Sequence, residues 1–341
     1  MTKTKNNTNG CFFVGVGFFL IIGIFLFLSI VFPFPEGAAL VISVVAAGFL
    51  TIKWLGLPSK KSLLQVALFL IFGFIVLKAG HSFLTSLSVN TDRQLTPEEG
   101  VTKTMKRIEN DSVLVFESHR DWQDNYGSSY SASLIVRARD YTKLHNHINK
   151  YPPADVPNFW GKLYQYIDKK DGPALDLVIA EFARINGERN LNQMEFAEMV
   201  VTCVQDIPYS LVFSEACLPA ENYEDSIKQV LIDCPACCIG NVAYGIQNPV
   251  SFLQNLKGDC DTRTVLIYSI LKHFDYDVAI LNSDFYRHSI IGINIPAKGD
   301  HKIYKGKKYK VWETTTKYFE AGELPYSFDD ITHWNVVLTS K

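Results

Sequence analysis

Cys260 is the residue of this sequence that is best placed for covalent chemistry. It belongs to the stretch Gly258-Asp259-Cys260-Asp261-Thr262, after which apolar residues recur at helical spacing from Val265 to Leu271. Asp259 is a favourable N-cap, so the pattern predicts a helix that begins at Cys260. A thiol in the first turn of a helix lies near unpaired backbone N–H groups and the positive end of the helix dipole, which favour the thiolate. Cys260 is therefore a candidate nucleophile with a lowered pKa, and the alternative is a buried thiol that only packs.

A histidine and a carboxylate follow on two predicted strands. His288 opens an alternating run that ends at Ile295, and a second strand runs from Gly306 to Glu313 after a turn-rich connection. If the two strands form an antiparallel hairpin in which Ile295 faces Gly306, the same register sets His288 opposite Glu313. Directly opposed residues share a sheet face, with Cβ atoms about 5 Å apart. The sequence therefore predicts that an imidazole and a carboxylate meet.

A thiol nucleophile, a general base and an acid that orients the base are what acyl transfer through a thiolate requires. The chain resembles the transglutaminase-like superfamily, with its papain-like Cys-His-acid core, in four stretches: 258–264, 276–281, 288–292 and 312–315. The resemblance covers about residues 245–325. It implies that Cys260 is the nucleophile, His288 the base and Glu313 the third member, although the family's acid is usually Asp. Asp284, near the base, is the alternative acid.

The resemblance also implies a fold. We expect an α+β, papain-like domain in which the helix that carries the cysteine packs on an antiparallel sheet. Acyl transfer further needs donors for an oxyanion, and the backbone N–H of Cys260 is the natural first donor. Gln247 is the candidate for the second, although it is equally consistent with the end of a loop. Trp312 should point to the sheet face opposite Glu313, into the core.

The N-terminal part of the chain predicts a membrane domain. Residues 1–10 form a polar tail, and three apolar stretches follow at 11–34, 37–52 and 63–84. A helix of ~20 apolar residues crosses a bilayer, so we expect three transmembrane helices within residues 11–84. Lysines precede the first stretch and crowd the connection between the second and third, which places both in the cytoplasm. The remainder is then expected on the periplasmic or extracellular side of the cell (inner) membrane, with the bilayer as a partner.

The remainder divides into two expected parts. Residues 85–207 are a linker and an N-terminal α+β part, and residues 208–341 are the transglutaminase-like catalytic core. In the first part the patterns predict helices at 96–109, 154–168, 173–185 and 192–205, and strands at 112–116 and 128–139. The whole chain has a net charge of −2. It shows no basic face for phosphate, which excludes a nucleic-acid partner.

Five cysteines cluster ahead of the predicted active-site helix: Cys203, Cys217, Cys234, Cys237 and Cys238. The last four are the candidates for disulfide formation. In an extracytoplasmic domain we expect a disulfide that joins Cys217 to one of the later three. The rival interpretation is a zinc site at Cys234 and Cys237, which needs two further ligands. We expect neither a metal nor a cofactor.

Two hypotheses about function follow. The first is a membrane-anchored, extracytoplasmic cysteine acyl-transferase or amidase/peptidase that acts on peptide or protein amides through a thioester on Cys260. The second is a catalytically inactive transglutaminase-like module that binds or scaffolds a partner. The complete Cys-His-Glu set favours the enzyme, but a fold alone does not decide function.

Overall fold

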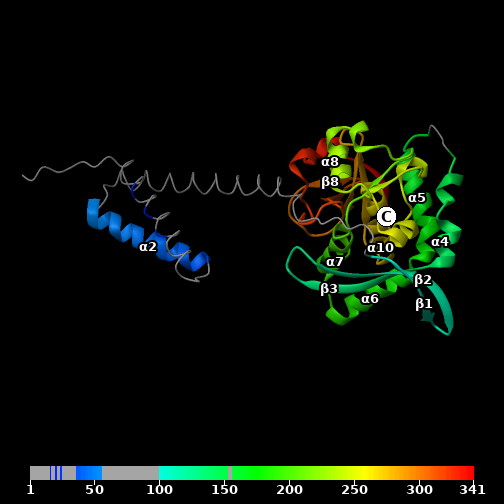
Figure 1. The fold of residues 1–341 in the computed structure, drawn as a ribbon, viewed down its shortest axis with the longest axis horizontal. Helices are drawn as coiled ribbons and strands as arrows, with labels where there is room; N and C mark the ends of the chain where they lie inside the picture. The colour runs from blue at the N-terminus through cyan, green and yellow to red at the C-terminus, as the bar shows by residue number, and fades with distance from the viewer. Residues whose placement is uncertain (1–15, 17–19, 21–23, 25–35, 56–99, 153–155) are drawn as a thin grey trace, which may run out of the picture. The chain divides into compact units, whose positions relative to one another are not determined.

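The computed structural model describes residues 16, 20, 24, 36–55, 100–152 and 156–341 (Figure 1). The chain divides into two compact units, Met1–Ser88 and Val89–Lys341, and each is described by itself. In the first unit the structure describes helix α2 (Glu36–Leu55). The second unit holds two β-sheets of three and five strands and the helices that pack against them.

The prediction of N-terminal transmembrane helices is wrong. Among the residues that the structure describes, no helix combines the length and the apolar character that a membrane span needs. α2 lies at the second predicted span, but it begins at Glu36 and carries Lys53 in its last turn. Its uninterrupted apolar stretch is therefore shorter than the ~20 residues of a typical span. The spans predicted at 11–34 and 63–84 lie outside the described residues, except for 16, 20 and 24. The multi-pass membrane localisation rested on these helices and is corrected with them.

The second unit is α+β and contains two antiparallel sheets. The first sheet has the order β1-β2-β3, formed by β1 (Thr102–Ile108), β2 (Asp111–Gln123) and β3 (Ser129–Arg137). The second has the order β10-β6-β7-β9-β8, formed by β6 (Val278–Ser283), β7 (His288–Ile293), β8 (His301–Tyr304), β9 (Lys307–Trp312) and β10 (Asn335–Thr339). The short strands β4 (Leu211–Val212) and β5 (Cys238–Ile239) form a parallel pair.

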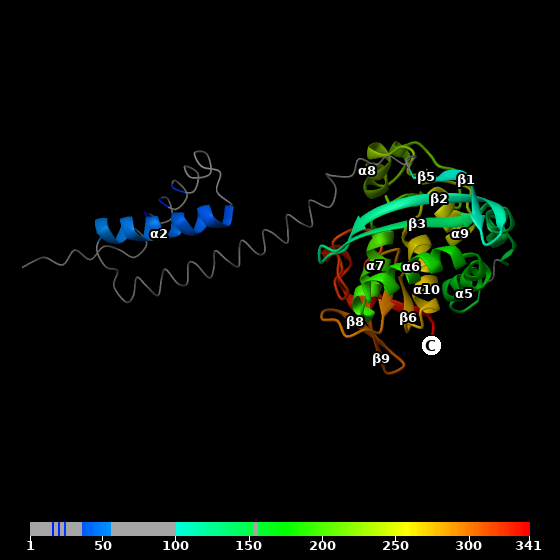
Figure 2. The ribbon, with the colours of Figure 1, turned by 90° about the horizontal axis from the view of Figure 1, so that it is seen from below.

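Helices fill the space between the two sheets (Figure 2). They include α5 (Phe159–Asp171), α6 (Asp176–Arg189), α7 (Gln193–Gln205), α9 (Pro249–Asn255) and α10 (Cys260–His273). α4 (Ala138–Leu144) packs on β2, β3 and α9, whereas α8 (Asp225–Asp233) lies outside this layer and packs on the short helix Ala220–Asn222. α6 packs on β3 and α7 on β2, whereas α10 packs on β6 and β7. α10 is therefore the central helix against the sheet that carries His288.

One hydrophobic core extends through both parts of residues 100–341. The main cluster of buried apolar side chains includes Trp122 and Leu134 of the first sheet, Val265 of α10 and Trp312 of β9. Arg263 is fully buried in this region, and its guanidinium donates to the carbonyls of Val204, Ile207 and Pro208. A buried cation needs such partners, so Arg263 ties α10 to the end of α7.

Most of the elements expected in residues 100–207 are present with shifted ends. The predicted helices at 154–168, 173–185 and 192–205 correspond to α5, α6 and α7. The strand predicted at 112–116 lies within β2, and the strand predicted at 128–139 corresponds to β3 but runs two residues into α4. The helix predicted at 96–109 is wrong, because Thr102–Ile108 form strand β1, which pairs along its whole length with β2. The edge of a long neighbouring strand outweighs local helix propensity at this place.

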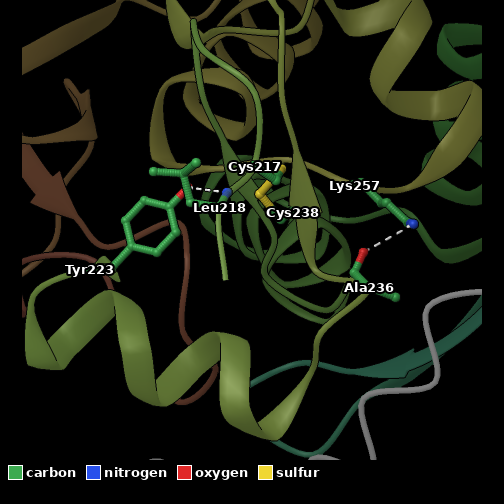
Figure 3. Close-up of a disulfide and its surroundings, with 6 residues drawn as sticks. All are labelled: Cys217, Leu218, Tyr223, Ala236, Cys238 and Lys257. Carbon is green, nitrogen blue, oxygen red and sulfur yellow. Dashed lines mark hydrogen bonds between the residues drawn. A yellow bond between two sulfur atoms is a disulfide. The ribbon is translucent and has the colours of Figure 1, made fainter. Parts of the chain in front are cut away.

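The segment between β4 and α9 contains two disulfides. Cys217 pairs with Cys238 (Figure 3). Cys234 pairs with Cys237. The partner of Cys217 is thus one of the three cysteines expected. Because Cys234 and Cys237 are bonded to each other, they have no thiolate to offer zinc, and the described residues contain no His, Cys, Asp and Glu group that could hold a metal ion.

Candidate active site

Cys260 is the first residue of α10, as the sequence predicts. The side chain of Asp259 caps the helix by accepting a hydrogen bond of 3.1 Å from the backbone N–H of Thr262. The thiol side chain is 7% exposed. Cys260 and the buried Cys203 are the free cysteines of the described residues.

His288 and Glu313 form an ion pair in which Nε2 lies 2.9 Å from Oε2. His288 begins β7, and Glu313 directly follows β9. The register that led to this pair is wrong by two residues, because β7 and β9 pair through Ile291 and Trp312 rather than through Ile295 and Gly306. A shift of two residues leaves every side chain on its predicted face. The two side chains therefore meet diagonally instead of directly opposite each other.

The carboxylate of Glu313 is fully buried and its second oxygen is well bonded. Oε1 accepts hydrogen bonds from the backbone N–H groups of Thr314 and Thr315, at 2.9 and 2.7 Å, and from the Thr315 hydroxyl at 2.6 Å. Burial acts to raise the pKa of Glu313, but the charge and hydrogen bond of His288 and the bonds from Thr315 outweigh it and lower the pKa to about 2. Burial likewise acts to lower the pKa of His288, and Glu313 raises it above its ordinary value. The contact therefore favours the ionised carboxylate of Glu313 and the protonated imidazole of His288.

The thiol of Cys260 differs from the expectation of a lowered pKa. Burial raises its pKa well above the ordinary value, and the charges of Asp261 and Asp259 raise it further. A hydrogen bond from the backbone of Ser289, the residue after His288, acts in the opposite direction but is the smaller effect. The resting thiol is therefore protonated, because the two neighbouring carboxylates and desolvation outweigh the helix terminus.

Gln247 is buried and its side chain is occupied by its own loop. Its amide donates to the carbonyl of Lys257 and its carbonyl oxygen accepts from Asn255 at 3.0 Å. Its backbone N–H donates to the hydroxyl of Thr262 at 3.1 Å. Gln247 therefore stabilises the loop before α10, and its donors are already bonded within that region. The backbone N–H of Cys260 lies at the first position of the helix, where no intrahelical acceptor exists, and it stays the candidate oxyanion donor.

Asp284, the alternative acid, is exposed in the turn between β6 and β7, whereas Glu313 makes the contact with His288. The imidazole of His288 stacks on Phe328 with ring centres 4.9 Å apart, and the ring centre of Trp334 lies 6.0 Å away in an edge-to-face arrangement. Trp312 is fully buried in the main core, on the face expected for it. The aromatic contacts restrict the imidazole to one orientation.

Two groups near the site were missed at the sequence level. The first is a network of Tyr164, Asp261, Asn282 and Ser289 between α5, α10, β6 and β7. The second is Gln205, which donates to the backbone carbonyl of Glu313 at 2.6 Å. Asp261 directly follows Cys260, and Ser289 directly follows His288, so their positions in the sequence already indicate that both lie near the site. Tyr164 and Gln205 come from helices far away in the sequence, and no local pattern marks them.

No family model, no curated protein and no solved structure matches this chain. The assignment of a function therefore rests on the residues of the site itself.

Proposed function

We propose that this protein is a transglutaminase-like cysteine acyl-transferase or amidase/peptidase that acts on peptide or protein amides through a thioester on Cys260. The observation that carries the proposal is the buried pair of His288 and Glu313, in which Nε2 and Oε2 lie 2.9 Å apart. The next residue of the strand, Ser289, makes a backbone hydrogen bond with Cys260 at the start of α10. A thiol at a helix N-terminus, an imidazole and an orienting carboxylate supply nucleophile, base and orienter.

The chemistry follows from the bonds that each group makes. Because Nε2 of His288 is bonded to Glu313, the other ring nitrogen, Nδ1, is the one to accept the thiol proton. The sulfur then attacks the amide carbon, an S–C bond forms, and the carbonyl oxygen becomes an oxyanion that the Cys260 N–H stabilises. The C–N bond breaks as the imidazolium returns its proton to the leaving amine. Water or a second amine resolves the thioester, which distinguishes hydrolysis from transfer.

One observation favours a second candidate, the inactive binding or scaffolding module. Cys260 is 7% exposed and its pKa is raised well above the ordinary value. A buried, protonated thiol is a poor nucleophile. In the enzyme, a neutral His288 must therefore remove the proton at the moment of attack, whereas in the module nothing removes it.

Turnover and trapping by the full-length chain separate the two candidates. The assay measures ammonia or amine released from a library of peptide amides, with hydroxylamine added to trap an acyl-enzyme. We expect release by the wild type and none by Cys260→Ala. Cys203→Ala is the matched control, because Cys203 is also a buried free cysteine but lies in α7. Equal release by the wild type and Cys260→Ala, or no release by either, contradicts the enzyme and leaves the binding module.

A further inference from the structure

The first turn of α10 and the start of β7 are joined by a network of hydrogen bonds in which Tyr164 and Ser289 are buried and Asp261 and Asn282 are half-buried. Asp261 follows Cys260, Ser289 follows His288, and the hydroxyl of Ser289 donates to Oδ1 of Asp261. The phenol of Tyr164, from α5, donates to the same carboxylate oxygen at 2.6 Å. Each of the two candidate catalytic residues thus has a direct chain neighbour in the network.

Asn282 closes the network from the adjacent strand. Its Oδ1 lies 3.0 Å from the hydroxyl of Ser289, and its Nδ2 donates to the phenol of Tyr164 at 2.8 Å. The pairing of β6 with β7 sets Asn282 directly opposite Ser289. Tyr164 and Ser289 are 0% and 1% exposed. Hydrogen bonds shielded from water in this way are stronger than exposed ones and hold one geometry.

We propose that Asp261, Ser289, Tyr164 and Asn282 form a latch that fixes the Cys260 thiol relative to the His288 imidazole. The inference rests on the function proposed above, and it makes the four residues positioning residues. Each catalytic side chain is one residue from the latch, so a displacement of the latch moves both. A misplacement of about 1 Å in a reacting pair costs about 100-fold in rate.

The latch also places a negative charge beside the thiol. The charged groups that act on Cys260 are Asp261 of α10, Asp259 at its N-cap and Glu313 after β9, and Cys260 in turn acts to raise the pKa of the buried Tyr209. After burial, Asp261 is the largest cause of the raised pKa of Cys260. Asp261→Asn keeps an acceptor oxygen for Ser289 and Tyr164 but removes this charge, so it separates the electrostatic part of the latch from its geometric part.

The geometric part is tested by steady-state kinetics of the full-length chain on a peptide amide. Ser289→Ala and Tyr164→Phe each remove one hydroxyl from the latch, and we expect kcat to fall about 10- to 100-fold with KM unchanged. Tyr268→Phe is the control, because Tyr268 is a buried tyrosine of α10 outside the latch. Denaturation curves establish that each variant is folded. Wild-type kcat in folded Ser289→Ala and Tyr164→Phe overturns the latch.

The electrostatic part is tested without any substrate. The rate of alkylation of Cys260 by iodoacetamide is followed against pH in the wild type and in Asp261→Asn. We expect the midpoint of the variant to be about one pH unit lower, which is a tenfold larger thiolate fraction at a given pH. An unchanged midpoint overturns the electrostatic part of the latch. If the wild type has no turnover, the proposed function fails by itself, and the alkylation profile still decides the role of Asp261.

Discussion

The described residues include two buried pairs of histidine and carboxylate, and the two pairs are similar in geometry. His288 and Glu313 lie 2.9 Å apart, with side chains 10% and 1% exposed. His147 and Asp171 lie 2.7 Å apart, with side chains 7% and 0% exposed. Each imidazole bonds through Nε2, and each lies next to an aromatic ring, Phe328 for the first and Tyr166 for the second.

The two pairs differ in what surrounds them. The second oxygen of Asp171 accepts from Nδ2 of Asn248 at 2.5 Å and from the backbone N–H of Val250 at 2.9 Å, so the pair fastens the end of α5 to the start of α9. The second oxygen of Glu313 bonds only within its own loop, to Thr314 and Thr315. Cys260, one of the two free cysteines of the described residues, bonds to the residue after His288.

The comparison shows that a buried imidazole and carboxylate at hydrogen-bond distance do not by themselves mark an active site. The same contact serves packing at His147 and, in our proposal, chemistry at His288. What distinguishes the two is the neighbouring thiol at a helix terminus, which in the described part of the chain only the pair of His288 and Glu313 has. The two pairs should therefore respond to mutation in opposite ways.

The largest expected effect separates the two histidines. His288→Ala removes the base, and we expect kcat to fall roughly 10⁴-fold, the upper end of what general acid–base catalysis contributes. His147→Ala leaves Asp171 buried without its partner, which costs about 3–5 kcal/mol of unfolding free energy. Turnover per folded molecule of His147→Ala should stay at the wild-type level. Peptide-amide kinetics and urea denaturation of both variants measure the two quantities. A loss of kcat in His147→Ala that matches His288→Ala breaks the comparison.

A smaller effect is expected for the acids. Glu313→Gln keeps the size of the side chain but removes the charge that stabilises an imidazolium, and we expect kcat to fall roughly 100-fold. Glu313→Asp keeps the charge on a side chain one methylene shorter and should lose less kcat than Glu313→Gln, whereas Cys260→Ala should lose more kcat than either. Asp171→Asn is the matched control and should lower stability without lowering kcat. Wild-type kcat in folded Glu313→Gln removes Glu313 from the proposed site.

The contact of His288 with Glu313 could be predicted from the sequence because an error of two residues in the strand register keeps both side chains on the same face of the sheet. β9 forms its tight hairpin with β8, through a turn at Lys305 and Gly306 in which both residues have positive φ, 48° and 78°. That is the conformation of a two-residue type I′ hairpin turn, which fixes β8 next to β9. β7 then pairs on the other side of β9, two residues from the expected register. The sheet face of His288 and Glu313 was therefore predicted correctly, whereas the residues directly opposite them were not.

The second pair and the latch could not be predicted, because their residues meet only through the packing of distant helices. Asp171 and Asn248 lie 77 positions apart in the chain, and Tyr164 and Asp261 lie 97 apart. Local periodicity carries no information about such contacts. The pKa of Cys260 was mistaken for a related reason. Its helix terminus is visible in the sequence, whereas its burial and the approach of two carboxylates are properties of the folded chain.

The last of these effects concerns the dependence of stability on pH, not the rate. Glu313 has an ordinary pKa of 4.5 and a pKa of about 2 in the folded protein, so between these values the unfolded chain binds a proton that the folded protein does not. Its contribution to stability is therefore complete above pH 4.5 and is lost as pH falls through about 2. His288 has a raised pKa, so its contribution is complete below its ordinary value of 6.5 and is lost as pH rises through the folded value. The pair stabilises the fold most between pH 4.5 and 6.5.

The difference in unfolding free energy between the wild type and Glu313→Gln measures this contribution. We expect its pH-dependent part to amount to about 3 kcal/mol and to disappear between pH 4.5 and about 2. His288 is the largest cause that lowers the pKa of Glu313, so the same comparison in a His288→Ala background should show a smaller pH-dependent part. Urea denaturation of the four proteins across this range provides the double-mutant cycle. An equal pH-dependent part in both backgrounds means that the Thr314 and Thr315 bonds alone hold the charge, and that Glu313 and His288 are packed together without being coupled.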